Sequence, residues 1–82
     1  MLAEEKLKEA KQKIIGTKQT KKAIEKEEVR MVFVARDAEK RVTEPIVKLC
    51  EEKDIEVIFV ATMEKLGGLC GIEVGSAAAA IV

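Results

Sequence analysis

Short apolar runs alternate with amphipathic segments along the whole chain, and this alternation restricts the possible folds more than any other feature. Segments with apolar residues at helical spacing predict helices, whereas short runs rich in β-branched or small apolar residues are typical of buried strands. The alternation predicts a mixed or parallel sheet with helices on both faces. The expected helices are residues 3–14, 17–26, 43–53 and 63–66, and the expected strands are 29–35, 55–61 and 77–82, with a very short strand or turn at 14–16.

Residues with capping side chains mark the expected helix starts. Thr17 and Thr62 are typical N-caps, and Thr43 with Pro45 just behind it predicts the start of the third helix. Gly67-Gly68 predicts the end of the last, short helix. Residues 37–41 and 72–75 are then expected as loops, the first with an irregular helical start as an alternative. The inward faces of the first three helices would carry Leu7, Ala10 and Ile14; Thr20, Ala23 and Ile24; and Ile46, Val47, Leu49 and Cys50.

The 82 residues predict a single domain, residues 1–82, with one small aliphatic core. Phe33 and Phe59 are the only aromatic residues, so recognition of single-stranded RNA by stacked bases is not expected. The formal net charge is zero, but residues 11–26 contain six lysines against one acid, Glu25. A local patch of this kind can bind a polyanion even when the whole chain is neutral.

The second expected helix concentrates this charge at its start. Lys18, Lys22 and Lys26 are spaced four residues apart and so share a face, where like charges repel, and Lys18 also lies at the positive end of the helix dipole. A bound anion would offset both the repulsion between the lysines and the unfavourable position of Lys18 at the helix dipole. Gly16 has no side chain, so it would let the backbone of a ligand approach the free N–H groups of the helix start. Lys18 and Gln19 would project toward such a ligand. An ordinary solvated lysine face remains the alternative.

Enzymatic and metal chemistry find little support in the sequence. It contains no histidine, and Cys50 and Cys70 do not form a Cys-x-x-Cys pair, so no metal site and no cofactor are expected. No pattern of an activated nucleophile is present, and Gly67-Gly68-Leu69-Cys70-Gly71 matches no phosphate-binding loop. The charged N-terminus and the absence of a long apolar run predict a cytoplasmic protein with reduced thiols and no membrane partner.

Three motifs, in order along almost the entire chain, carry a family resemblance. Residues 14–20 (IIGTKQT), 32–38 (VFVARDA) and 66–74 (LGGLCGIEV) resemble the kink-turn-binding ribosomal protein family, which includes the archaeal large-subunit protein L-seven-Ae and short bacterial members. The resemblance implies a three-layer α-β-α sandwich with a small mixed four-stranded sheet. It also implies binding of kink-turns, which are RNA helices bent sharply at a bulge beside sheared G·A pairs.

The same resemblance implies which residues contact RNA. The family motif G-T-N-E-x-x-K is matched by Gly16, Thr17 and Lys22, and its lysine contacts phosphate or base. Lys18 and Gln19 stand where archaeal members have Asn and Glu, which puts the base contacts in question because a Gln amide can both donate and accept. A second contact is implied for the apolar loop Ile72-Glu73-Val74, which packs on the extruded nucleotide of the bulge.

These observations together predict a non-enzymatic, monomeric RNA-binding protein. Its partner would be a structured kink-turn RNA, with ribosomal RNA and riboswitches as candidates and with no small-molecule substrate. Lys13, Lys21 and Lys26 are weaker candidates for phosphate contacts than Lys22. The alternative is a protein-protein interaction module on the same scaffold, which would use an exposed apolar patch such as Val42, Ile72 and Val74.

Overall fold

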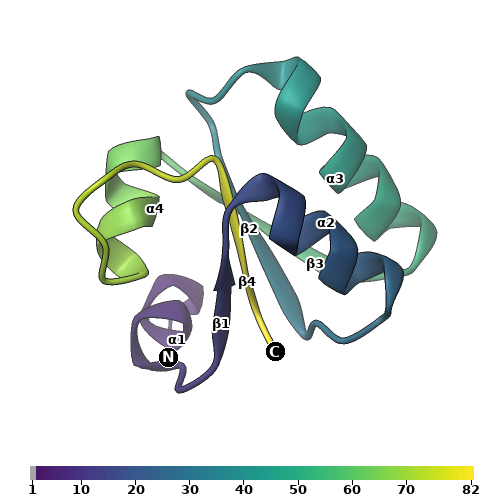
Figure 1. The fold of residues 1–82 in the computed structure, drawn as a ribbon, viewed down its shortest axis with the longest axis horizontal. Coiled ribbons are helices and arrows are strands. Elements are labelled where there is room, and N and C mark those ends of the chain that lie inside the picture. Colours follow the sequence, from purple (N-terminus) through teal and green to yellow (C-terminus); the bar gives the residue numbers. More distant parts are fainter. Residues whose placement is uncertain (1) are drawn as a thin grey trace.

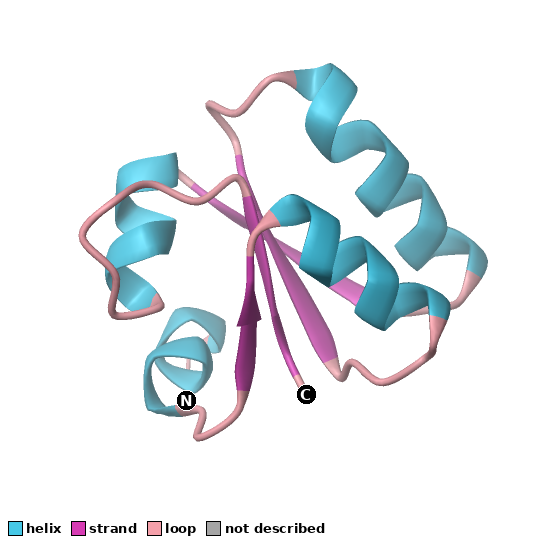
Figure 2. Cartoon of the chain, viewed as in Figure 1, coloured by secondary structure: helices cyan, strands magenta, loops and turns pink. Residues whose placement is uncertain are grey.

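Four helices alternate with four strands, as the sequence predicted (Figures 1 and 2). The computed structural model describes residues 2–82. In chain order the elements are α1 (Ala3–Glu9), β1 (Lys13–Ile15), α2 (Thr17–Glu25), β2 (Met31–Ala35), α3 (Lys40–Glu52), β3 (Glu56–Val60), α4 (Met63–Leu69) and β4 (Ala78–Ile81).

The strands form one mixed sheet in the order β1-β4-β2-β3. Strand β4 is antiparallel to both β1 and β2, with Ala80 opposite Ile14 on one side and Val32 on the other. Strand β2 is parallel to β3. The carboxyl ends of β1, β2 and β3 therefore lie at the same edge of the sheet as the start of β4. We call this the upper edge, after its place in Figure 1.

The helices cover the sheet in two pairs, which gives three layers. Helices α2 and α3 lie side by side on one face, whereas α1 and α4 lie on the other (Figure 1). The predicted three-layer α-β-α sandwich is confirmed. Residues Ala78, Ala79 and Ala80 of the inner strand β4 are completely buried, and their small side chains let helices from both sides approach closely.

Each face of the sheet carries its own apolar core. Leu7, Phe33 and Leu66 belong to the core beneath α1 and α4, and Ile24 and Ile46 belong to the core beneath α2 and α3. These five side chains have at most 1% of their surface exposed. Burial of a side chain of this size contributes about 1.5–3 kcal/mol relative to exposure. The two cores together hold the sheet between its helices.

The first helix is shorter than predicted. It ends at Glu9, and Ile14 lies in β1, where it pairs with Ala80 instead of extending the helical stripe. The helical spacing of Ile14 was misleading because pairing with β4 outweighs a weak local helix preference. Helix α2 presents Thr20, Ala23 and Ile24 inward as predicted.

The starts of α2 and α3 also differ from the prediction. Gly16 rather than Thr17 is the N-cap of α2, and Thr17 is its first residue. Helix α3 begins at Lys40, in the segment predicted as a loop, so Thr43 and Pro45 lie inside it. Pro45 is tolerated there because the backbone carbonyl that loses its N–H partner belongs to Arg41, and both residues are exposed to water.

Helix α4 continues through the two glycines that were predicted to end it. It ends one residue further on, and Gly71, with φ of 82°, follows its C-cap, Cys70. The N–H of Ile72 donates to the carbonyl of Gly67 (3.0 Å) and that of Gly71 donates to Gly68 (3.0 Å). This is a Schellman ending, so the left-handed residue and not the glycine pair fixes the end of the helix.

Strand β3 was predicted to be buried, but it lies at an edge of the sheet. Of its five residues only Val60 is buried, while Glu56 and Phe59 are exposed. The spacing of apolar residues in the sequence could not show the edge position of β3, because edge strands and central strands can have similar apolar runs.

Helices α2 and α3 end in the same motif as α4, but with non-glycine residues in the left-handed conformation. Glu27 has φ of 57° and Asp54 has φ of 56°. The N–H of Glu28 donates to the carbonyl of Ala23 (3.0 Å), which completes the ending of α2. A left-handed conformation costs an ordinary L-residue about 1–2 kcal/mol.

We therefore expect Glu27→Gly to be more stable than the neighbouring control Glu28→Gly by about 1 kcal/mol, because only position 27 gains from the freedom of glycine. Urea unfolding of both variants at high salt, where the exposed Glu27–Lys53 ion pair (3.8 Å) is screened, measures the difference. Equal losses of stability in the two variants would contradict this account of the helix end.

Candidate nucleic-acid interface

The turn between β1 and α2 depends on a backbone conformation that favours glycine. Gly16 has φ of 103°, and no other atom lies within 4 Å of the position that a Cβ would occupy. Its N–H donates to the carbonyl of Ala78 (2.9 Å), and its own carbonyl accepts from Thr20 (3.0 Å). The glycine therefore sets the direction of α2 and leaves open space above the turn for a ligand.

The start of α2 presents unopposed positive charge. No side-chain hydrogen bond caps this helix, and its first turn contains no acidic residue. Lys18 and Gln19 are exposed, and Thr17 is half-buried. Free N–H groups and the positive end of the helix dipole favour an anion at this position.

The lysines of α2 add to this charge. Lys18, Lys21, Lys22 and Lys26 are exposed, and none takes part in an ion pair within residues 2–82. Lys13 is different, because its amine donates to the backbone carbonyls of Leu7 (3.2 Å) and Lys8 (3.3 Å) near the end of α1. Four lysines of the predicted basic face are thus free to meet a polyanion, whereas the amine of Lys13 is occupied.

The second predicted contact segment lies between α4 and β4. Ile72 is half-buried and packs against the core under α1 and α4, whereas Glu73 and Val74 are exposed. Val74 has 69% of its surface exposed. The segment therefore presents an apolar side chain to the solvent from an anchored backbone.

Close packing against α4 holds this segment in place. A Cβ at Gly67 would lie 2.0 Å from the carbonyl oxygen of Val74, and one at Gly75 would lie 3.2 Å from the Cβ of Met63. The N–H of Ser76 also donates to the carbonyl of Met63 (3.0 Å). The close approach of this segment thus explains the glycines at positions 67 and 75, whereas Gly68 has open space around it.

The two predicted contact segments meet at one backbone carbonyl. The oxygen of Ala78 accepts from the N–H of Gly16 (2.9 Å) and from the Oγ of Ser76 (2.7 Å). The start of α2 and the end of the 72–76 segment are therefore neighbours at the upper edge of the sheet, although about 60 residues separate them in the sequence.

Two side chains that support this edge were not predicted as site residues. The carboxylate of Asp37 accepts from the N–H of Met63 (2.7 Å), which ties the β2–α3 loop to the start of α4. Ser76 is buried, and its Oγ donates the hydrogen bond to the Ala78 carbonyl given above. Asp37 lies in the second family-like motif, which was its only signal, and no motif or spacing pointed to Ser76.

The two cysteines lie in separate parts of the core. Cys50 and Cys70 are free and buried, and they belong to opposite faces of the sheet, so they cannot pair. Burial raises the pKa of Cys50 to about 11 and also raises the pKa of Cys70, which the nearby Lys13 partly offsets. Both thiols are thus neutral and unreactive at neutral pH.

No group of three or more metal-ligating side chains occurs among residues 2–82. None of the helices in this range is long and apolar enough to span a membrane. Apolar side chains of some size are exposed at Val42 and Phe59, in addition to Val74.

The fold and its upper edge define a small α-β-α domain with a basic helix start beside an apolar loop. A sequence model described as the Ribosomal protein L7Ae/L30e/S12e/Gadd45 family matches residues 2–82. The chain belongs to this family, which confirms the resemblance found in the three motifs.

Several curated relatives are similar over most of their length. An "RNA-binding protein" of Bacillus pumilus is 46% identical over 78 residues, which is 95% of each chain. "RNA-binding protein YbxF" of Geobacillus stearothermophilus is 41% identical over the same share of both chains. The "Large ribosomal subunit protein eL8" of Halobacterium salinarum is 48% identical over 68 residues, which cover 82% of this chain and 57% of that protein.

A solved structure supports the fold. A protein of unknown function from Bacillus halodurans superposes with a TM-score of 0.80 at 23% identity, covering 92% of this chain and 75% of the other. At this identity the likeness extends to the fold alone.

The packing of the 72–76 segment on α4 predicts opposite effects for two adjacent glycines. Gly67→Ala should lower the free energy of unfolding by about 1–3 kcal/mol, because its Cβ collides with the Val74 carbonyl. Gly68→Ala should raise it by about 0.5–1 kcal/mol, because this exposed position is open and alanine favours a helix. Urea unfolding measures both, and a stable Gly67→Ala variant with unshifted NMR signals in residues 72–76 would contradict the packing.

Proposed function

We propose that this protein is a non-enzymatic, cytoplasmic RNA-binding protein that recognises kink-turn RNA, with ribosomal RNA or a riboswitch as its target. The observation that carries the proposal is the junction at Ala78, which brings the uncapped start of α2 beside the apolar 72–76 segment. A kink-turn offers the matching features, namely a backbone bent close to its G·A pairs and an extruded nucleotide. The printed names of the relatives agree with RNA as the class of ligand.

Phosphate binding falls to the first turn of α2 and its lysine face. The open space above Gly16 lets a phosphate reach the N–H groups of the first turn. Lys22 lies one helical turn after Lys18 and would neutralise a neighbouring phosphate, with Lys21 and Lys26 as further contacts. This term provides affinity and orientation but no sequence preference.

Base recognition falls to Lys18 and Gln19. Both are exposed at the positive end of α2. A base next to a phosphate bound there would present its edge to these two side chains. Lys18 donates to guanine acceptors, whereas the amide of Gln19 both donates and accepts. We assign these two side chains to the sheared G·A pairs.

The 72–76 segment supplies the apolar contact. Val74 would pack on the extruded nucleotide, Ile72 anchors the backbone beneath it, and the exposed Glu73 between them would lie at the same contact. The segment is already ordered by its bonds to Met63 and Ala78, so little conformational entropy is lost on binding. Binding would then stabilise the bent RNA, which is only partly populated without protein.

Replacement of Lys22 by alanine should weaken binding to a kink-turn RNA roughly tenfold, because a charged contact to phosphate is lost. The slope of log affinity against log salt should become shallower by about 0.9, the value for one phosphate. Binding titrations at several salt concentrations measure both. Lys8→Ala, at an exposed position in α1 on the opposite face, is the matched control and should leave both unchanged. An unchanged slope in Lys22→Ala would remove Lys22 from the phosphate contacts.

Replacement of Gln19 by glutamate should change the preference among RNAs more than the stability of the protein. A glutamate only accepts hydrogen bonds, so the discrimination between G·A pairs and their substitutes should shift by about 1–3 kcal/mol. Thermal stability should hold or rise slightly, since an acid in the first turn favours the helix dipole. Binding to a panel of kink-turns with altered G·A pairs tests this. A uniform change across the panel would exclude Gln19 from base recognition.

A further inference from the structure

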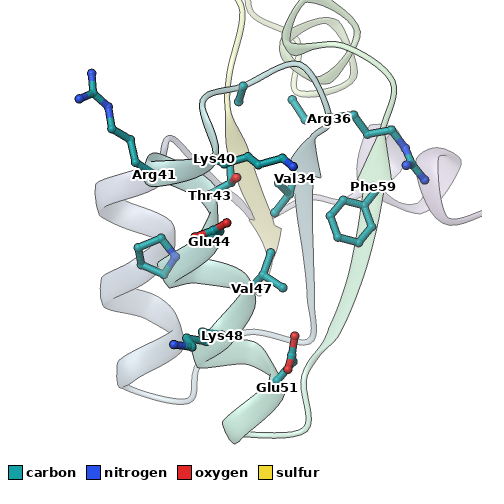
Figure 3. Close-up of a pocket in the computed structure, with 13 residues that line it drawn as sticks. Val34, Arg36, Lys40, Arg41, Thr43, Glu44, Val47, Lys48, Glu51 and Phe59 are labelled. Atoms are coloured by element: carbon teal, nitrogen blue, oxygen red, sulfur yellow. The ribbon is translucent and has the colours of Figure 1, made fainter.

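A groove of about 830 Å³ lies between α3 and the edge strand β3 (Figure 3). The buried side chain of Val34 is at its base, and Val47 and Phe59 face each other from α3 and β3. The groove opens near the carboxyl end of β2, at the upper edge of the sheet. It contains none of the residues assigned above to kink-turn binding.

Phe59 gives the groove an exposed aromatic wall. It is one of only two aromatic residues in the chain, and 45% of its surface is exposed. The guanidinium of Arg36 stacks on the ring, with its central carbon 5.3 Å from the ring centroid. Figure 3 shows Arg36 on the outer side of the ring and the groove on the inner side. The ring therefore has a cation on its outer side, and its inner side borders the groove.

Cations outnumber acids around this apolar slot. Arg36, Lys40 and Lys48 line it and form no ion pair within residues 2–82, whereas Arg41 pairs with Glu39 at 2.7 Å. Glu44 and Glu51 line it as well. Arg36 and Lys40 lie at the end of the groove near the upper edge. An apolar groove with an exposed aromatic ring on one side and cations at one end suits a ligand in which a planar ring is linked to an anionic group.

We propose that this groove binds an unpaired nucleotide of single-stranded RNA, with the base stacked on the inner face of Phe59 and the adjoining phosphate held by Lys40 and Arg36. Base stacking on an aromatic side chain backed by a cation is sequence-tolerant, because every base has a π-face. The apolar wall of Val47 would cover the other face of the base. The sequence did not predict such a stacking surface, because the exposure of Phe59 cannot be seen in the sequence.

The groove is close to the proposed kink-turn interface. The N–H of Ala35 donates to Ala77 (2.9 Å), next to the Ala78 carbonyl that holds Gly16. From β1 to β3 the edge spans three strand spacings, or roughly 15 Å. If the proposed function holds, a single strand leaving the kink-turn can reach the groove, and the groove extends the recognised RNA beyond the bend.

The experiment is an NMR titration that follows the phenylalanine ring signals. The chain has no Tyr, Trp or His, so these signals stand alone, and the buried Phe33 is an internal reference. The probes are a hexauridylate, which has no stable helix, and a blunt-ended kink-turn duplex. The variants are Phe59→Leu, which keeps apolar bulk, Phe59→Tyr, which keeps the ring, and Lys40→Gln, with Lys8→Gln as the charge control on the opposite face.

The hexauridylate should shift the NMR signals of the Phe59 ring and leave those of the Phe33 ring unchanged. The same shift should occur when the protein is already saturated with the kink-turn duplex. Phe59→Leu should weaken hexauridylate binding roughly tenfold, whereas Phe59→Tyr should bind like the parent protein. Lys40→Gln should weaken binding and Lys8→Gln should not. Phe59→Leu should bind the blunt kink-turn unchanged.

An unmoved Phe59 ring, or a Phe59→Leu variant with full affinity for the hexauridylate, would overturn the proposal; the groove would then serve another class of partner, such as a protein segment. Hexauridylate shifts confined to α2 would also overturn it and would leave the kink-turn function intact. Shifts at Phe59 together with no binding of the kink-turn duplex would support the groove and refute the proposed function.

Discussion

The pairing of β4 between β1 and β2 is the constraint on which the rest of the structure depends. It turns three parallel strands into one mixed sheet, and it brings the end of the chain back to the middle of the molecule. The completely buried Ala78, Ala79 and Ala80 are small enough for helix pairs to pack on both faces. The carbonyl of Ala78 then holds Gly16 and Ser76 together, so the same strand builds the core and assembles the candidate site.

In the proposed function, charge and shape have different roles at the upper edge of the sheet. In the proposed complex, the free amides of the first turn of α2 and the unpaired charge of the lysines behind it would together attract a polyanion without selecting it. In the same proposal, Lys18, Gln19 and the 72–76 segment would add the contacts that select a bent RNA by its base edges and its extruded nucleotide. The tight packing of Gly67 against Val74 explains how an exposed apolar side chain stays in a fixed position. The groove beside Phe59 would extend this surface to a flanking strand.

Local sequence signals predicted the order of elements, because helical spacing and short apolar runs are properties of neighbouring residues. They failed where a distant segment decides the conformation. Ile14 fits a helical stripe but pairs with β4, and Gly67 looks like a helix end but accommodates Val74. The exposure of Phe59 follows from the edge position of β3, which no local pattern encodes. The α2 turn could be proposed as a binding site from the sequence because glycine and lysine at a helix start favour an anion, and its role stays a prediction. Asp37 and Ser76 act only through contacts formed in the folded chain, which the sequence does not show.

The central claim is recognition of a kink-turn, and the most direct test is a binding titration at two salt concentrations. The two RNAs are a kink-turn and a control in which Watson–Crick pairs replace the G·A pairs. Our account predicts tight binding to the kink-turn at both salt concentrations and weak, strongly salt-dependent binding to the control. Equal and weak binding to both RNAs, lost together as salt rises, would contradict it and leave only a basic surface.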